Sequence, residues 1–247
     1  LAPSVYLGVI PLLQTNDGRL SLIGPGRTVD YLVKMRRLPH ELSLESQLAR
    51  GVVQLAEIDR AAGQLMDFYL RAPAAGFIDT TELYAWLAVA PAELDQLLQA
   101  PPNASEPLRN ALLQWLRQRQ SLLEQRPLRE VHGDLRPQHI YLGPTPLFID
   151  RLEFNRDLRL LDPVEELAFL ALECERLGGA WVGERFLTLY AQLSGDPPPP
   201  SLVAFYKARR ALLWALLSAR HLARGGPARW ADRARLYLQL GSAALAG

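Results

Sequence analysis

Hydrophobic and polar positions along the first forty residues follow the short-period pattern that is typical of β-strands. Three apolar runs can be recognised, Val5 to Leu13, Arg19 to Ile23 and Val29 to Met35. Asn16-Asp17-Gly18 and Gly24-Pro25-Gly26 separate them, and both are turn signals. The pattern therefore predicts a small antiparallel sheet at this end of the chain.

From Ser43 onward the hydrophobic spacing becomes helical. Gly51 is expected to separate two helices, and further helices are predicted over Thr80–Leu98 and Glu106–Leu123. After Pro163 the pattern is helical almost to the end of the chain, with breaks at Gly178-Gly179 and at the prolines that follow Asp196. Five tryptophans are spread over these segments, and they are expected in the core: Trp86, Trp115, Trp181, Trp214 and Trp230.

Strand-like runs return briefly between the helical segments, at Val131, Ile140–Leu142 and Leu147–Ile149. The order is a small sheet, then helices, then a short β insertion, then helices again. This order predicts an α+β fold with two lobes, in which the insertion is the odd element.

Composition restricts the class of protein without identifying it. The formal charge is +1, from 27 basic and 26 acidic residues, so no long-range field favours nucleic acid or a membrane. The lone cysteine, Cys174, cannot form an internal disulfide and is expected to be a buried thiol. The chain begins Leu1-Ala2-Pro3 without a signal-peptide pattern, and we interpret it as a fragment or trimmed product in the cytoplasm.

The β insertion carries the candidate chemistry. Asp134 follows a glycine that allows a sharp turn, and Asp150 follows three apolar residues at the end of a predicted buried strand. A β-hairpin between them would bring both carboxylates to the same end. One carboxylate could accept a proton from an attacking hydroxyl, and the other could hold a divalent cation against a triphosphate. The alternative is a hairpin with solvated acids at its turns.

The two segments HGDLRPQHIYL (132–142) and LFIDRLEFN (147–155) resemble the catalytic and metal-binding loops of the aminoglycoside and choline kinase-like superfamily. The segments VYLGVIPL (5–12), VKMRRLP (33–39) and 152–178 are similar to its bacterial aminoglycoside phosphotransferase-type domains, some of which are fused to an ATP-binding domain. The resemblance implies a protein-kinase-like two-lobed fold. Residues 1–37 would be the remnant of an incomplete N-terminal β lobe and hinge. Residues 38–247 would be a mostly helical C-terminal lobe with its catalytic hairpin at about 130–155.

The resemblance also implies roles for individual residues. Asp134 matches the catalytic base and Asp150 the magnesium ligand, while His132 matches the structural histidine of the loop. Glu153 matches an acidic position that could contact substrate or support the metal ligand. His139 stands where the family has a metal-binding asparagine. Because imidazole prefers transition metals, Mn²⁺ is an alternative to Mg²⁺ here.

Lys34 and Met35 admit more than one interpretation. Tyr31 to Met35 looks like the strand that carries the phosphate-binding lysine of protein kinases. The resemblance instead places Lys34 and Met35 on the strand that enters the hinge, where backbone groups meet adenine. A surface lysine on an edge strand is the third alternative.

The function that these residues favour is ATP-dependent phosphoryl transfer to a hydroxyl or amine of a small molecule, with ATP and Mg²⁺ as cofactors. A pseudokinase or nucleotide-binding regulatory module without turnover is the alternative, and a hydrolase is weaker because no nucleophile with a histidine base is apparent. Two further acids, Glu165 and Glu166, follow Pro163. They are expected only to offset the dipole of the helix that begins there.

Overall fold

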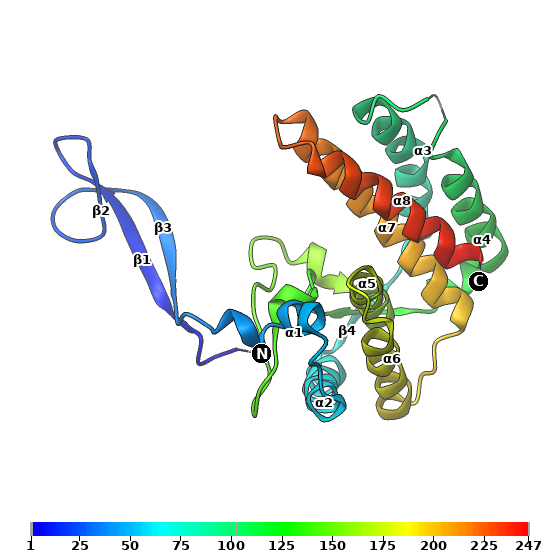
Figure 1. The fold of residues 1–247 in the computed structure, drawn as a ribbon, viewed down its shortest axis with the longest axis horizontal. Helices are drawn as coiled ribbons and strands as arrows, with labels where there is room; N and C mark the ends of the chain where they lie inside the picture. The colour runs from blue at the N-terminus through cyan, green and yellow to red at the C-terminus, as the bar shows by residue number, and fades with distance from the viewer. Residues whose placement is uncertain (1, 102, 247) are drawn as a thin grey trace.

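The computed structural model describes residues 2–101 and 103–246. A three-stranded antiparallel sheet extends from one side of a helical body (Figure 1). Its strands are β1 (Tyr6–Gln14), β2 (Leu20–Ser21) and β3 (Arg27–Met35), in the order β2-β1-β3. The sheet that the sequence predicts over the first forty residues is confirmed, with Val9 of β1 opposite Val33 of β3.

This sheet exposes apolar side chains on both of its faces. Val9 and Val33 are 64% and 51% exposed on one face, and Leu32, next to Val33 on β3, is 42% exposed on the other. A sheet that is apolar on both faces is typical of one that is covered on both sides. The sheet is unusual because it extends away from the body and yet exposes apolar side chains on both faces.

The body consists mainly of helices. Their bounds are α1 (Leu44–Arg50), α2 (Leu55–Arg71), α3 (Thr80–Leu97), α4 (Glu106–Glu124), α5 (Pro163–Arg176), α6 (Ala180–Ser194), α7 (Pro200–Ala223) and α8 (Arg229–Ala246). Gly51 ends α1 with a left-handed φ of 66°, which is the break that the sequence predicts between the first two helices. The mixed fold with a mostly helical second part is confirmed.

The short strands of the body form two further sheets. One has the order β4-β5-β8, from Ala74–Phe77, Pro127–Glu130 and Leu160–Leu161. The other pairs β6 (Ile140–Tyr141) with β7 (Leu147–Phe148), as the sequence predicts. Single-turn 3₁₀ helices lie at η1 (His40–Leu42), η2 (Pro137–His139) and η3 (Asp157–Arg159). The strands β4, β5 and β8 were not predicted, because β4 contains a glycine, β5 carries two charged residues, and β8 has only two residues.

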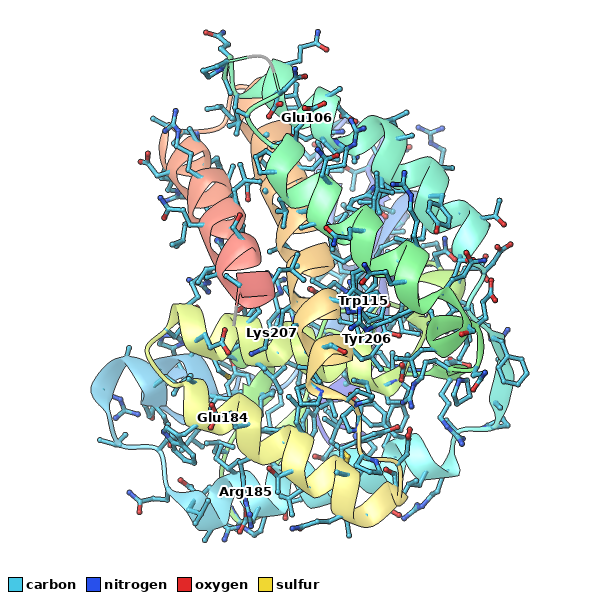
Figure 2. All side chains as sticks on the ribbon, turned by 90° about the vertical axis from the view of Figure 1, so that its right-hand side faces the viewer. Glu106, Trp115, Glu184, Arg185, Tyr206 and Lys207 are labelled. Atoms are coloured by element: carbon cyan, nitrogen blue, oxygen red, sulfur yellow. The ribbon has the colours of Figure 1, made fainter. Side chains whose placement is uncertain are left out.

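Helix α5 is the centre of the body, because every residue from Pro163 to Cys174 is buried. Helices α6 and α7 pack against it, and α8 packs along α7. Figure 2 shows α4 alongside α7, with Trp115 at this contact, where its ring stacks on Phe205 at 4.1 Å between centroids. Burial raises the pKa of the Cys174 thiol strongly, so it is the buried thiol that the sequence indicates.

The tryptophans are less uniform than expected. Trp115 is buried and Trp214 stacks on Phe169 at 5.4 Å, but Trp181 is 41% exposed on α6. The expectation that all five belong to the core is therefore wrong for Trp181. No helix within 2–101 and 103–246 combines the length and the apolar character that crossing a membrane requires.

Candidate active site

The segment from His132 to Asp134 connects β5 to η2 and is shaped by Gly133. Gly133 has a φ of 92°, a conformation that residues with side chains rarely adopt. A β-carbon at this position would lie 3.0 Å from Leu152 Cδ1 and 3.1 Å from the Leu158 carbonyl oxygen. Glycine is required here, so that the chain can turn and present the Asp134 carboxylate.

The side chain of Glu166 holds this loop through hydrogen bonds to its backbone. Its buried carboxylate accepts hydrogen bonds from the backbone N–H of His132 at 3.0 Å and of Gly133 at 2.5 Å. The Tyr69 hydroxyl of α2 donates a third at 2.5 Å. Burial raises the pKa of Glu166, and these three donors oppose the rise. Donors on both carboxylate oxygens are the arrangement that suits the ionised form.

Glu165 and Glu166 do more than offset the dipole of α5, which is the role that the sequence predicted for them. Both side chains are buried, and Glu165 forms ion pairs with Arg209 and with Arg210, the latter at 2.7 Å. These acids connect α5 to the His132–Asp134 loop and to α7, which goes beyond offsetting a helix dipole. One signal in the sequence could have indicated this: two acids stand directly before the apolar run 167–172, where an acid needs partners.

Asp162 is a second residue that the sequence analysis missed. It caps α5 by accepting from the Val164 N–H at 3.0 Å, and Arg126 binds it at 2.8 Å. The Tyr206 hydroxyl donates to it at 2.9 Å. These contacts fix the start of the helix that carries Glu166, and hence the support of the loop.

Asp134 lies at the surface of the loop, with its side chain 16% exposed. Arg136 Nη2 lies 2.6 Å from Asp134 Oδ2. His139 turns back toward the same residue, and its Nδ1 lies 2.8 Å from the Asp134 carbonyl oxygen. Since a carbonyl only accepts, this ring nitrogen is the one that carries the proton.

The β6–β7 hairpin brings Asp150 to the same place. His139 Nε2 lies 3.3 Å from Asp150 Oδ2, so the imidazole stands between the two aspartates. Asp150 has a left-handed φ of 61°, and its side chain is 73% exposed. Its backbone N–H donates to the Tyr6 hydroxyl of β1 at 2.8 Å. Asp134, His139 and Asp150 thus form one cluster, which the extended sheet reaches through Tyr6.

The remaining candidates from the sequence lie apart from this cluster. Lys34 and Met35 are exposed at the end of β3, where Lys34 pairs with Gly8 and Met35 with Tyr6. Glu153 is exposed in the loop after Asp150, and no hydrogen bond or ion pair is recorded for its carboxylate within the described part of the chain. The structure therefore brings together three of the predicted site residues and leaves Lys34, Met35 and Glu153 at the surface.

His132 is fully buried, and its Nε2 lies 2.8 Å from the Ile149 carbonyl oxygen, to which it donates. Burial lowers the pKa of His132 from 6.5 to about 4. The unfolded chain therefore binds more protons between these values. The stability due to neutral His132 is complete above about pH 6.5 and is lost as the pH falls toward 4, at most about 3 kcal/mol.

We expect ¹H–¹⁵N NMR to show His132 as the neutral Nε2–H form at pH 5, while the same ring in urea-unfolded protein protonates near pH ~6.5. Urea unfolding between pH 7.5 and 4.5 should show a weaker loss of stability in His132→Gln than in the wild type. Protonation of His132 in the folded protein above pH 5.5 would contradict the burial argument.

The structure contains a cavity of about 450 Å³ near the start of α5. It lies between α3, α5, α7 and the β5–β8 region, and its wall includes Leu158, whose carbonyl oxygen would lie 3.1 Å from a β-carbon at position 133. Trp86 and Tyr206 supply aromatic surface. Asp79, Glu82 and Asp157 also line it, and no basic side chain within the described ranges forms an ion pair with any of these three acids.

Comparison with known proteins places this geometry in context. No protein-family model matches the chain. Uncharacterized proteins of Mycobacterium tuberculosis and Mycobacterium bovis are 29% identical over 248 residues, covering 95% of this chain and 48% of their own length. The chain thus spans about half the length of the curated relatives it matches.

Solved structures of two small-molecule kinases have a fold similar to that of this chain. Choline kinase LicA from Streptococcus pneumoniae has a TM-score of 0.57 at 22% identity, over 77% of this chain and 63% of that one. LicA in complex with AMP scores 0.59 at 20% identity, over 96% and 72%. Glucosamine kinase with glucosamine, ADP and inorganic phosphate scores 0.53 at 16% identity, over 86% and 64%. The chain therefore has the fold of these small-molecule kinases.

Proposed function

We propose that this chain is the catalytic part of an ATP-dependent phosphotransferase that acts on a small molecule. The observation that carries the proposal is the cluster in which His139 lies between the backbone of Asp134 and the carboxylate of Asp150. Two carboxylates at the mouth of a rigid hairpin are the minimal set that phosphoryl transfer needs, because most of its catalysis is positioning and charge neutralisation.

In this proposal Asp134 is the general base. The hydroxyl or amine of the acceptor attacks the γ-phosphorus and loses its proton to the Asp134 carboxylate, while the bond to the bridging oxygen breaks and ADP leaves with the electron pair. Gly133 and Glu166 hold the carboxylate in place, since one allows the turn and the other binds the loop amides. Positioning of this kind is what a base in phosphoryl transfer requires.

Asp150 and His139 are the residues that would hold the metal ion. With Nδ1 directed at the Asp134 carbonyl oxygen, Nε2 is the His139 nitrogen that faces Asp150 Oδ2, at 3.3 Å, and it would be the metal ligand. Two ligands that each lie about 2.1 Å from one Mg²⁺ can be up to ~4.2 Å apart, so this pair fits a shared cation. No larger group of His, Cys, Asp and Glu ligands occurs among the described residues. A bound cation would neutralise charge on the triphosphate.

The identity of that cation follows from the imidazole. Because nitrogen ligands favour transition ions, we expect Mn²⁺ to support ADP binding and turnover better than Mg²⁺. His139→Asn restores an oxygen ligand and should reverse the preference toward Mg²⁺ by about tenfold. Titration calorimetry of ADP with each ion measures this without turnover, and the nearby Gln138→Asn serves as control. If His139→Asn abolishes activity with both ions, the histidine has a chemical role of its own.

The sheet formed by β1 and β3 is proposed as part of the nucleotide-binding lobe, spanning residues 1–37. Lys34 and Met35 would lie on the strand that enters the hinge, where backbone groups could meet adenine. Tyr6 supports this arrangement, because its hydroxyl already contacts the backbone of Asp150 at 2.8 Å.

The cavity whose wall includes Leu158 is proposed as the acceptor site. The two arginines of its wall, Arg209 and Arg210, are both paired with Glu165. The remaining acids Asp79, Glu82 and Asp157, together with Trp86, would suit an acceptor that carries a positive charge as well as the reacting hydroxyl or amine. Glu153, in the exposed loop that follows Asp150, remains a candidate substrate contact.

A nucleotide-binding module without turnover is the second candidate function, and His139 at the metal site favours it. A binding assay combined with a turnover assay separates the two. The full-length protein should bind ATP and should release ADP faster when amino sugars or amino alcohols are added, with ³¹P NMR identifying the phosphorylated product. Tight ATP binding without ADP release under any acceptor would establish the binding module instead. Absence of nucleotide binding would exclude both.

A further inference from the structure

Arg136 is the charged side chain of the site for which neither the fold nor the proposed function has yet provided a role. It lies two residues after Asp134 and directly precedes η2. Its Nη2 is 2.6 Å from Asp134 Oδ2, and the two side chains are 15% and 16% exposed. A guanidinium is therefore already in contact with the proposed base.

The Arg136 side chain packs against the helical body. Its guanidinium carbon lies 4.7 Å from the centroid of the Trp214 ring on α7, and Trp214 stacks in turn on Phe169 of α5. The face of an indole ring attracts a guanidinium without accepting a conventional hydrogen bond from it. Trp214 therefore holds Arg136 against the body and leaves its N–H donors available.

Most of those donors are not used within the described structure. A guanidinium has five N–H donors, and the bond to Asp134 uses one of them. Arg136 Nε is buried without a hydrogen-bond partner in the described ranges. By contrast, Arg151 and Arg159 are bound to Glu130, and Arg209 is bound to Glu165. Arg136 is thus a cation beside the base with spare donors.

The transferred phosphoryl group would come within reach of these donors. A general base lies about 3 Å from the acceptor atom, and that atom approaches the phosphorus to about 3–3.5 Å. Since Arg136 Nη2 is 2.6 Å from the base, its fork needs only a small movement to meet phosphoryl oxygens. A terminal phosphate carries more charge than a carboxylate and matches the fork of the guanidinium.

We propose that Arg136 is a catalytic residue that binds the γ-phosphoryl group and exchanges its contact with Asp134 for that group when ATP binds. The inference rests on the proposed phosphotransferase function. In the nucleotide-free chain the pair holds Asp134 in place. In the loaded enzyme Arg136 neutralises charge on the phosphoryl oxygens, and Asp134 is released to accept the acceptor's proton.

The test compares a nucleotide that has a γ-phosphoryl group with one that lacks it. Affinities of the full-length protein for AMP-PNP and for ADP, each with Mn²⁺ or Mg²⁺, are measured by calorimetry. We expect Arg136→Gln to weaken AMP-PNP binding by at least about tenfold and to leave ADP binding unchanged. Asp134→Asn removes the competing carboxylate, so AMP-PNP should bind about fivefold more tightly. That gain should disappear in the Arg136→Gln background.

Arg220→Gln is the matched control, because Arg220 is also bound to a carboxylate, Glu93 at 2.7 Å, on the same helix as Trp214. It should change neither affinity. Equal effects of Arg136→Gln on AMP-PNP and ADP, or no effect on either, would overturn this inference while the phosphotransferase function stands. If the wild type binds neither nucleotide, the proposed function fails and the inference fails with it.

Discussion

Replacing Asp134 by asparagine should reduce turnover by on the order of a hundredfold or more and leave ADP affinity unchanged. Asparagine has nearly the same shape as aspartate but cannot accept the acceptor's proton. The loop should keep its position, because Glu166 binds the backbone N–H groups of His132 and Gly133 and does not contact the changed side chain. Steady-state kinetics and ADP titration measure the two quantities separately.

Asp150→Asn is the companion variant. It weakens a metal ligand, so it should reduce ADP affinity in the presence of the metal ion and leave metal-free binding unaffected. Equal loss of nucleotide binding in both variants would show that the roles of Asp134 and Asp150 have been exchanged or shared. Unchanged turnover in Asp134→Asn would exclude it as the base.

Replacing Glu166 by glutamine should destabilise the protein by about 3 kcal/mol and lower turnover by about tenfold or more. The carboxylate accepts from three donors, the two loop N–H groups and the Tyr69 hydroxyl. A glutamine amide offers one acceptor oxygen and turns an NH₂ group toward at least one of those donors. A buried donor would then lose its partner, and the catalytic loop would shift.

Tyr69→Phe is the control for this variant, because it removes one of the three donors and leaves the carboxylate on the loop. It should cost about 1 kcal/mol and preserve turnover. Urea unfolding gives the stability of each variant, and kinetics well below the unfolding transition give the turnover. A Glu166→Gln protein with wild-type stability and rate would mean that the loop is positioned by other contacts.

The sequence predicted the parts of the fold whose hydrophobic pattern is strong. The N-terminal sheet and the helical body carry several residues of regular period. The β6–β7 hairpin is just as short as the missed strands, but its strands lie in two apolar runs, 140–142 and 147–149. The strands β4, β5 and β8 were missed because β4 contains Gly76, β5 carries two charged residues, and β8 has only two residues beside a helix start. Strands this short form because the surrounding helices place their backbones side by side, which no local pattern encodes.

The candidate site was predictable to the extent that it lies in one segment. Asp134, His139 and Asp150 were identified from their spacing and resemblance, and the structure brings them together. Glu166 and Asp162 come from the next helix, and their contacts with the loop and with Arg126 depend on how α5 packs. Acids in the first turn of an exposed helix mainly offset the helix dipole. The first turn of α5 is buried, so its acids need hydrogen-bond or ion-pair partners instead.

Glu166 has a consequence for how this site can change over time. It binds backbone amides, which every residue except proline provides, so its hold on the loop does not depend on the loop's other side chains. The residues after Asp134 can then be substituted without moving the loop that carries the Asp134 carboxylate. The imidazole at position 139, where the resembling family has an asparagine, is a change of this kind. Separating the support of the loop from its chemistry allows one scaffold to explore new metal ions and acceptors by single mutations.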